Sequence, residues 1–129
     1  MKWIPILMAL LLLSGCAAQA QKEQSYRQIN MDEAIAMMEA ESDYIILDVR
    51  TPEEFSEKHI PGAINVANET IGSEEILELP DKDQLILVYC RSGNRSKQAS
   101  EKLVPLGYTN IIEFGGINDW PGEVVSGAE

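Results

Sequence analysis

Short apolar runs alternate with amphipathic, polar segments along most of this chain. The continuous apolar run Leu85–Tyr89 predicts a strand that is covered on both faces, and a further strand is predicted at Tyr44–Val49. Further strands are predicted at 26–29, 63–66 and 110–114, and helices at 31–40, 51–58, 74–79 and about 96–104. Alternating strands and helices are typical of a parallel sheet with helices on both faces. We therefore expect a three-layer α/β/α domain with a mainly parallel central sheet of about five strands.

Local signals mark where several of these helices begin and end. Asn30 is followed three residues later by Glu33, a variant of the capping box. Thr51 is followed by Pro52, and proline is favoured at the first position of a helix. Pro105 is expected to end the last helix near residue 104, because proline cannot continue a regular helix.

The first 25 residues differ in composition from the rest of the chain. Lys2 precedes a ten-residue apolar run at 4–13, and the sequence Leu13-Ser14-Gly15-Cys16 ends it, which resembles a lipoprotein signal peptide. The run is shorter than the about 20 apolar residues of a membrane span. We expect a signal peptide at 1–15, a lipidated Cys16 with a flexible tether at 16–25, and a folded domain at 26–129. Cleavage by an ordinary signal peptidase near Ala18-Gln19-Ala20 is the alternative.

The charge balance limits the partners that the domain can bind. The chain has ten basic and 21 acidic residues, a net charge of −11. Removal of residues 1–15 takes away Lys2 and would leave nine basic and 21 acidic residues, a net charge of −12. Such an acidic surface argues against nucleic acid and against electrostatic docking on anionic lipid. We expect an exported monomer in a bacterial cell envelope, whose one membrane contact is the lipid on Cys16.

The two cysteines of the chain are assigned different roles. Lipidation of Cys16 would leave Cys90 as the free thiol, which excludes a disulfide within the domain and a dithiol cycle. Cys90 lies between the apolar run at 85–89 and a polar loop, Arg91-Ser92-Gly93-Asn94-Arg95, that leads into a helix at Ser96. Backbone N–H groups converge where a loop enters a helix, and the helix dipole adds positive potential there. The loop therefore predicts a cradle for anions.

A thiol in that cradle is favoured as a thiolate, because Arg91 and Arg95 lie beside it in the sequence. Cys90 is therefore the candidate nucleophile. The simpler interpretation of Cys90 is a buried, inert thiol at the end of a strand. The change from an apolar run to polar residues at this position favours the reactive thiol.

Four motifs resemble those of single-domain rhodaneses in order and approximate spacing. They are Asp48-Val49-Arg50, His59-Ile60-Pro61-Gly62-Ala63, the Cys90 loop, and Gly115-Gly116 followed by Trp120, and the resemblance covers residues 26–122. Rhodaneses transfer sulfane sulfur through a cysteine persulfide, so the resemblance implies that Cys90 carries the sulfur. It implies a small donor such as thiosulfate, an acceptor that is cyanide, a thiol or a protein, and no metal or organic cofactor. The residues expected to bind the donor oxyanion and the persulfide are Arg91, Arg95, Ser92, Gly93, Asn94 and Ser96.

Three further residues are expected near the site or in support of it. Asp48 and Cys90 both lie at carboxyl ends of predicted strands, where ligands collect in parallel sheets. Asp48 and Arg50 are candidate supporting partners, with Arg50 pairing a carboxylate or facing the loop. A purely structural ion pair that orients the helix at 51–58 is the other interpretation. The resemblance places His59 in a structural turn rather than in a general-base role.

Two other classes of function compete with sulfur transfer. Cysteine phosphatases also hold a thiolate in an anion-binding loop closed by arginine, but they use Cys-x5-Arg, whereas Cys90 to Arg95 is Cys-x4-Arg. The smaller ring should crowd a phosphoryl group and still leave room for one extra sulfur atom. A non-enzymatic sulfane-sulfur carrier or partner-binding module is the second alternative, which the sequence leaves open.

Overall fold

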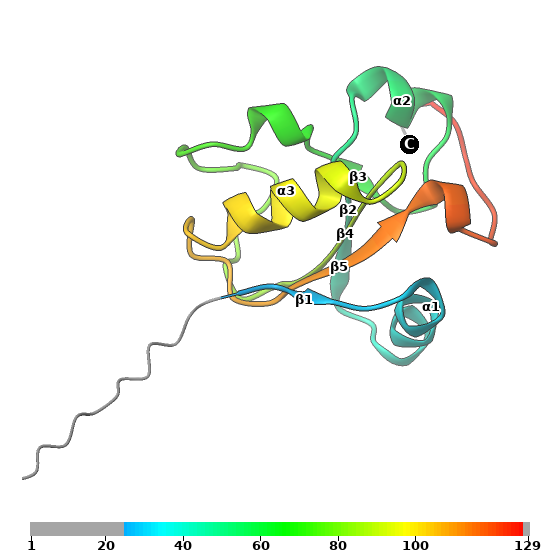
Figure 1. Ribbon diagram of the computed structural model, residues 1–129, viewed down its shortest axis with the longest axis horizontal. Helices are drawn as coiled ribbons and strands as arrows, with labels where there is room; N and C mark the ends of the chain where they lie inside the picture. Colours follow the sequence, from blue (N-terminus) through cyan, green and yellow to red (C-terminus); the bar gives the residue numbers. More distant parts are fainter. Residues whose placement is uncertain (1–24, 128–129) are drawn as a thin grey trace, which may run out of the picture.

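A parallel sheet with strand order β1-β5-β4-β2-β3 organises residues 25–127, the part of the chain that the computed structural model describes (Figure 1). The strands are β1 (Arg27–Gln28), β2 (Tyr44–Asp48), β3 (Ile64–Asn65), β4 (Leu85–Cys90) and β5 (Ile111–Gly116). The helices are α1 (Met31–Ala40), α2 (Pro52–Glu57) and α3 (Asn94–Leu103), with short 3-10 helices η1 (Asn68–Thr70) and η2 (Ile117–Asp119). Every strand pairing in the sheet is parallel.

The sheet lies between two helical layers, with α1 and α3 on opposite faces (Figure 1). One face packs in a hydrophobic cluster with Ala99 and Leu103 of α3, and the other packs in a cluster with Ala34 of α1. Residues 86–90 of the central strand β4 are buried. Burial of apolar side chains on both faces explains the continuous apolar run in this strand. The expected three-layer α/β/α domain is confirmed.

The expected caps form at the first two helices. The Asn30 side chain accepts a hydrogen bond from the Glu33 N–H at 2.8 Å, and Glu33 returns the bond to the Asn30 N–H at 2.9 Å. Thr51 and Glu54 form the equivalent capping box at α2, where Pro52 occupies the first helical position. These reciprocal bonds satisfy backbone donors that a helix start otherwise leaves unpaired.

The predicted helix at 74–79 is wrong. The segment is irregular apart from one turn, in which the Leu79 N–H donates to the Ile76 carbonyl. Ile76 and Leu79 are buried, whereas the Leu77 side chain between them is 86% exposed. Six residues that include three glutamates gain too few hydrogen bonds to offset the cost of starting a helix.

The boundaries around Cys90 also differ from those expected. Helix α3 begins at Asn94 rather than at Ser96, and β4 includes Cys90 itself. The connection is therefore only the tripeptide Arg91-Ser92-Gly93, and the residues at 94–96 belong to the first helical turn. The start of α3 is therefore two residues closer to Cys90 along the chain than the sequence predicts.

The N-terminal predictions lie outside the described residues. The expected signal peptide at 1–15, Cys16 and all of the tether except Ser25 are in that part of the chain. Within residues 25–127, none of the helices has both the length and the apolar character needed to cross a bilayer.

Candidate active site

Cys90 is the last residue of β4, at the carboxyl edge of the sheet, and α3 begins four residues later at Asn94. The Cys90 side chain is buried, with a residue exposure of 1%. The Gly93 N–H donates a hydrogen bond to the Cys90 sulfur at 3.0 Å. Gly93 has a φ of +113°, a conformation that side chains with a Cβ rarely adopt, and this geometry turns its N–H toward the sulfur. The sulfur therefore has a fixed N–H donor at the amino end of a helix, as an anion-binding cradle requires.

Strand β5 shapes the loop that follows Cys90. The pairing of β4 with β5 shifts between Val88, opposite Glu113, and Cys90, opposite Gly116, so β5 contains one extra residue. At Gly116 the backbone of the Cys90 loop comes so close that a Cβ atom would lie 2.0 Å from the Arg91 carbonyl oxygen. Glycine at this position lets the loop pack directly on β5. This explains why Gly115-Gly116 accompanies the Cys90 loop in the sequence.

Ser96 connects the thiol to a buried carboxylate that the sequence analysis did not name. The Ser96 hydroxyl lies 3.4 Å from the Cys90 sulfur and 2.5 Å from Oε2 of Glu113. Glu113 is 3% exposed and also accepts hydrogen bonds from the Gly115 N–H at 3.0 Å and from the Gln28 side chain at 3.3 Å. Glu113 is thus held by neutral donors, with a single hydroxyl between it and the thiol.

Glu54 of α2 holds the two arginines of the Cys90 loop region. Its carboxylate accepts two hydrogen bonds from Arg95, at 2.7 and 3.0 Å, and lies 3.9 Å from Arg91. These bonds from Arg95, followed by those from Thr51, lower the pKa of Glu54 to about 2. Arg95 is partly buried, whereas the Arg91 side chain is 65% exposed. The expected role of both arginines in oxyanion binding stays a prediction. The structure adds that both arginines lie beside the same carboxylate, Glu54.

Asp48 and Arg50 form a buried ion pair, with 2.6 Å between Arg50 Nη2 and Asp48 Oδ2. The same Arg50 nitrogen donates to the Lys58 carbonyl at 2.7 Å, which ties the end of α2 to β2. Asp48 also accepts a hydrogen bond from the Tyr89 hydroxyl at 2.6 Å, and burial together with Asp48 raises the pKa of Tyr89. The contacts of this pair are thus with α2 and β4, as in the structural interpretation of the two residues.

The remaining predicted residues occupy different surroundings. Ser92 and Asn94 are exposed at the loop and at the start of α3. His59 is buried, its ring stacks on Phe55 at a centroid distance of 3.7 Å, and its Nδ1 lies 2.8 Å from the Phe55 carbonyl. Trp120 packs against a core cluster and donates to the Glu123 carbonyl.

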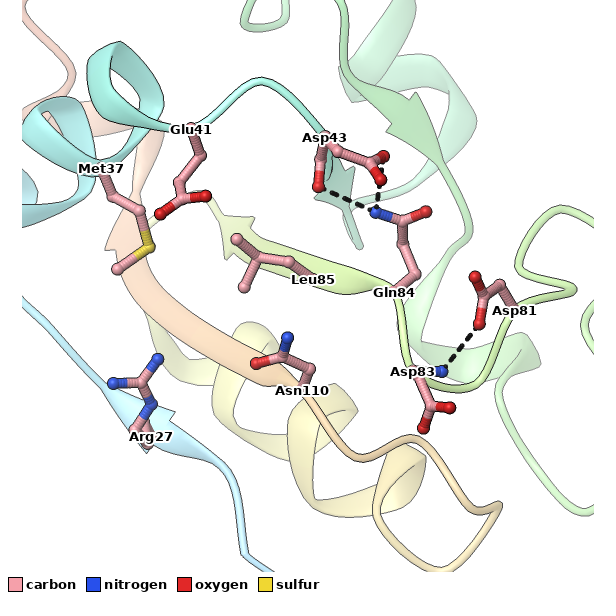
Figure 2. Close-up of a pocket in the computed structure, with 9 residues that line it drawn as sticks. All are labelled: Arg27, Met37, Glu41, Asp43, Asp81, Asp83, Gln84, Leu85 and Asn110. Atoms are coloured by element: carbon pink, nitrogen blue, oxygen red, sulfur yellow. Dashed lines mark hydrogen bonds between the residues drawn. The ribbon is translucent and has the colours of Figure 1, made fainter.

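An acidic cavity lies at the opposite end of the sheet from Cys90. The cavity has a volume of about 410 Å³. Figure 2 shows its lining side chains, among them Glu41, Leu85 and Arg27. Its lining includes Asp43 and Gln84 next to the amino ends of β2 and β4. Within residues 25–127, no cluster of three or more histidine, cysteine, aspartate or glutamate side chains is arranged to hold a metal ion. The thiol, loop and helix start at the carboxyl edge are the candidate active site, because the Gly93 N–H there is directed at the Cys90 sulfur.

Two acidic residues of this site were missed by the sequence analysis. Glu113 is the one charged residue in the run Ile111-Ile112-Glu113-Phe114, and a single charge in a buried strand is a signal that could have found it. Glu54 lies in the first turn of α2, where an acidic residue is common and points to no particular partner. Its contact with Arg95 joins residues 41 positions apart, so no local pattern indicates it.

The fold and site together define a class of protein: an α/β domain that presents one thiol in an N–H cradle at the carboxyl edge of a parallel sheet. The sequence profile described as "Rhodanese-like domain" matches residues 30–123. The chain belongs to the rhodanese-like domain family.

Individual relatives agree with this assignment. Thiosulfate sulfurtransferase PspE of Escherichia coli (strain K12) is 38% identical over 73 residues, which cover 57% of this chain and 70% of PspE. Thiosulfate sulfurtransferase GlpE of Pseudomonas entomophila (strain L48) is 31% identical over 107 residues, 79% of this chain and 94% of GlpE. A solved structure of a rhodanese with anions from E. coli has a TM-score of 0.59 at 36% identity and covers 65% of this chain and 99% of its own. These similarities identify a rhodanese-type sulfurtransferase.

Proposed function

We propose that this rhodanese-type sulfurtransferase moves sulfane sulfur from a donor such as thiosulfate to a thiophilic acceptor through a persulfide on Cys90. The observation that carries the proposal is the 3.0 Å hydrogen bond from the Gly93 N–H to the Cys90 sulfur at the start of α3. A donor group fixed in this direction stabilises negative charge on sulfur without having to reorganise during the reaction. The names of PspE and GlpE support thiosulfate as the donor.

The proposed reaction is a double displacement. The Cys90 thiolate attacks the outer sulfur of thiosulfate, a new S–S bond forms, and the old S–S bond breaks with its electron pair leaving on sulfite. Arg91 or Arg95 would bind the departing oxyanion through charge-assisted hydrogen bonds. In the second half, cyanide or a thiolate attacks the outer sulfur of the persulfide, and the electron pair of that S–S bond returns to Cys90. The cycle requires no metal or organic cofactor.

Mass spectrometry of the peptide that carries Cys90 tests the proposal. Treatment of the protein with thiosulfate should add the mass of one sulfur to this peptide, and cyanide should remove it while thiocyanate forms. The matched control is Cys90→Ser, which should gain no sulfur and show no turnover. Substantial thiocyanate formation by Cys90→Ser would overturn the assignment of Cys90.

The same experiment separates the enzyme from its alternatives. Catalytic turnover with cyanide or a thiol identifies a transferase, whereas sulfur that loads once and leaves only to a protein acceptor identifies a carrier. The Cys-x4-Arg spacing argues against phosphoryl transfer, because the ring is one residue smaller than in cysteine phosphatases. Phosphatase activity far above sulfurtransferase activity would contradict the proposed function.

For cellular location, we propose that Cys16 is the lipidated N-terminus and that the folded domain lies outside the cytoplasm. The support is the apolar run at 4–13 followed by Leu13-Ser14-Gly15-Cys16. Labelled palmitate should enter the protein and salt should not release it from membranes, while Cys16→Ser should lose the label. A soluble, unlabelled protein that begins at Gln21 would instead identify Ala18-Gln19-Ala20 as the cleavage signal.

A further inference from the structure

Two arginines beside the thiol share one carboxylate. Arg95 uses both of its terminal nitrogens on Glu54, with Nη1 2.7 Å from Oε1 and Nη2 3.0 Å from Oε2, and Nη1 of Arg91 lies 3.9 Å from the same Oε2. A carboxylate bound in this way fills the planar fork that a guanidinium otherwise offers to an oxyanion. Glu54 therefore occupies the fork of Arg95 and leaves only its other N–H groups for a sulfur donor.

The Glu54 carboxylate is fixed in this position by its own helix. Its Oε1 accepts hydrogen bonds from the Thr51 N–H at 3.0 Å and from the Thr51 hydroxyl at 3.1 Å, so the capping box of α2 holds the same oxygen that Arg95 binds. Its pKa, lowered to about 2 by Arg95 and then by Thr51, keeps Glu54 ionised throughout the neutral range. Arg91, Arg95 and Glu54 thus present one net positive charge to a donor, rather than the two of the arginines alone.

We propose that Glu54 is a positioning residue that acts through Arg95 and shifts the preference of the site from doubly charged toward singly charged sulfane-sulfur donors. Thiosulfate carries two negative charges at neutral pH. A persulfide carries one, and so does a thiosulfonate, in which carbon replaces one oxygen of thiosulfate. Coulomb energy scales with the product of the charges, so each positive charge at the site favours the dianion. Glu54 offsets one such charge. The inference rests on the proposed function and names the class of donor for the same site.

The reaction with a singly charged donor balances in the same way as the reaction with thiosulfate. The Cys90 thiolate attacks the outer sulfur of methanethiosulfonate, a new S–S bond forms on Cys90, and the old S–S bond breaks with its electron pair leaving on methanesulfinate. Methanethiosulfonate keeps the central sulfur of thiosulfate and all but one of its oxygens. The two donors therefore differ mainly in charge, which makes them a matched pair of probes.

Other acidic groups near the arginines are less suited to this role. The pKa of Arg95 is raised first by its hydrogen bonds to Glu54, and then by the charges of Glu54, Cys90 and, last, Glu69. Glu69 and Glu53 are both exposed. Because solvent screens exposed charges, the carboxylate that is bonded directly to Arg95 has the strongest effect on what this arginine can bind.

Steady-state kinetics with the two donors test the proposal, with cyanide as the acceptor and the full chain at pH 7. The measured quantity is the ratio of kcat/KM for thiosulfate to kcat/KM for methanethiosulfonate, which cancels any loss of folded protein. Glu54→Gln should raise this ratio on the order of fivefold at low salt, chiefly through a lower KM for thiosulfate, and added salt should reduce the rise. Glu53→Gln, which removes an exposed charge from the same helix, should keep the wild-type ratio.

A double-mutant cycle with Arg95→Ala tests whether Glu54 acts through this arginine. The rise in the ratio from Glu54→Gln should be smaller by about twofold or more in the Arg95→Ala background. An equal rise in both backgrounds would overturn the action through Arg95. An unchanged or lower ratio in Glu54→Gln itself would overturn the proposal as a whole.

A measurement on the wild type alone decides the matter if Glu54→Gln does not fold. Sulfate, with two negative charges, and methanesulfonate, with one, should inhibit thiosulfate turnover competitively with Ki values within about fivefold of each other. A greater preference for sulfate, or no inhibition by either anion, would overturn the proposal. Failure of the proposed function is distinct, because it would appear as no turnover with either donor.

Discussion

Replacement of Glu54 by glutamine should reveal how much the contact between α2 and α3 contributes to stability. Glutamine keeps an oxygen that can accept the Thr51 hydrogen bonds of the capping box, but it loses the charge that binds Arg95. The side chains of Arg95 and Glu54 are 30% and 22% exposed, so solvent screens this pair only in part. The substitution therefore isolates the ion pair from the helix cap.

The pKa of Glu54 sets an upper limit for the effect. A decrease from 4.5 to about 2 corresponds to about 3 kcal/mol of stabilisation of the folded state by the ionised carboxylate. Part of this belongs to Thr51, and solvent screening reduces the rest, so we expect Glu54→Gln to lose about 1 to 2 kcal/mol at pH 7. Because the pKa is lowered in the folded state, the stabilisation is complete above pH 4.5 and is lost as the pH falls toward 2.

Urea unfolding of wild type and Glu54→Gln between pH 7 and pH 3 measures this difference. The gap in the free energy of unfolding should be constant from pH 7 to about 5 and should narrow below pH 4.5. Glu53→Gln, at the exposed neighbouring position, is the control and should leave stability within about 0.5 kcal/mol. Equal stability of Glu54→Gln and wild type at pH 7, or a gap that does not change with pH, would refute the assignment of this energy to the ion pair.

Two further substitutions test the site itself. Arg95→Ala should lower kcat/KM for thiosulfate by about one to two decades, because a charge-assisted contact is worth roughly 1.5 to 3 kcal/mol. Alkylation of Cys90 by iodoacetamide, an uncharged reagent, should fall much less. Equal losses in the two reactions would show that Arg95 shapes the loop instead. Gly116→Ala should abolish persulfide formation or lower the melting temperature markedly, because the new Cβ would lie 2.0 Å from the Arg91 carbonyl. Gly72→Ala, where a Cβ meets no atom within 4 Å, is its control, and a normal Gly116→Ala would contradict the close approach.

Local patterns were sufficient for the elements in which one short segment decides its own structure. The capping box at Asn30 joins residues three positions apart, so the sequence alone indicates it, and Thr51 followed by Pro52 likewise indicates the start of α2. Short apolar runs within β2 and β4 predict buried parallel strands, because this pattern also lies within a few consecutive residues. The segment at 74–79 shows where local patterns fail. Ile76 and Leu79 are spaced as on one face of a helix and both are buried, but the segment that places them in the core is irregular.

The sequence by itself determined the α/β architecture, the thiol at the end of a strand and the helix start beside it, because periodicity and turn residues act over a few positions. Only the tertiary structure decided what surrounds that thiol. Arg95 meets Glu54 and Ser96 meets Glu113 across 41 and 17 positions of the chain. Such contacts arise when α2 and β5 are packed against α3, and a charged side chain has no preference for one distant partner until the fold brings the two together.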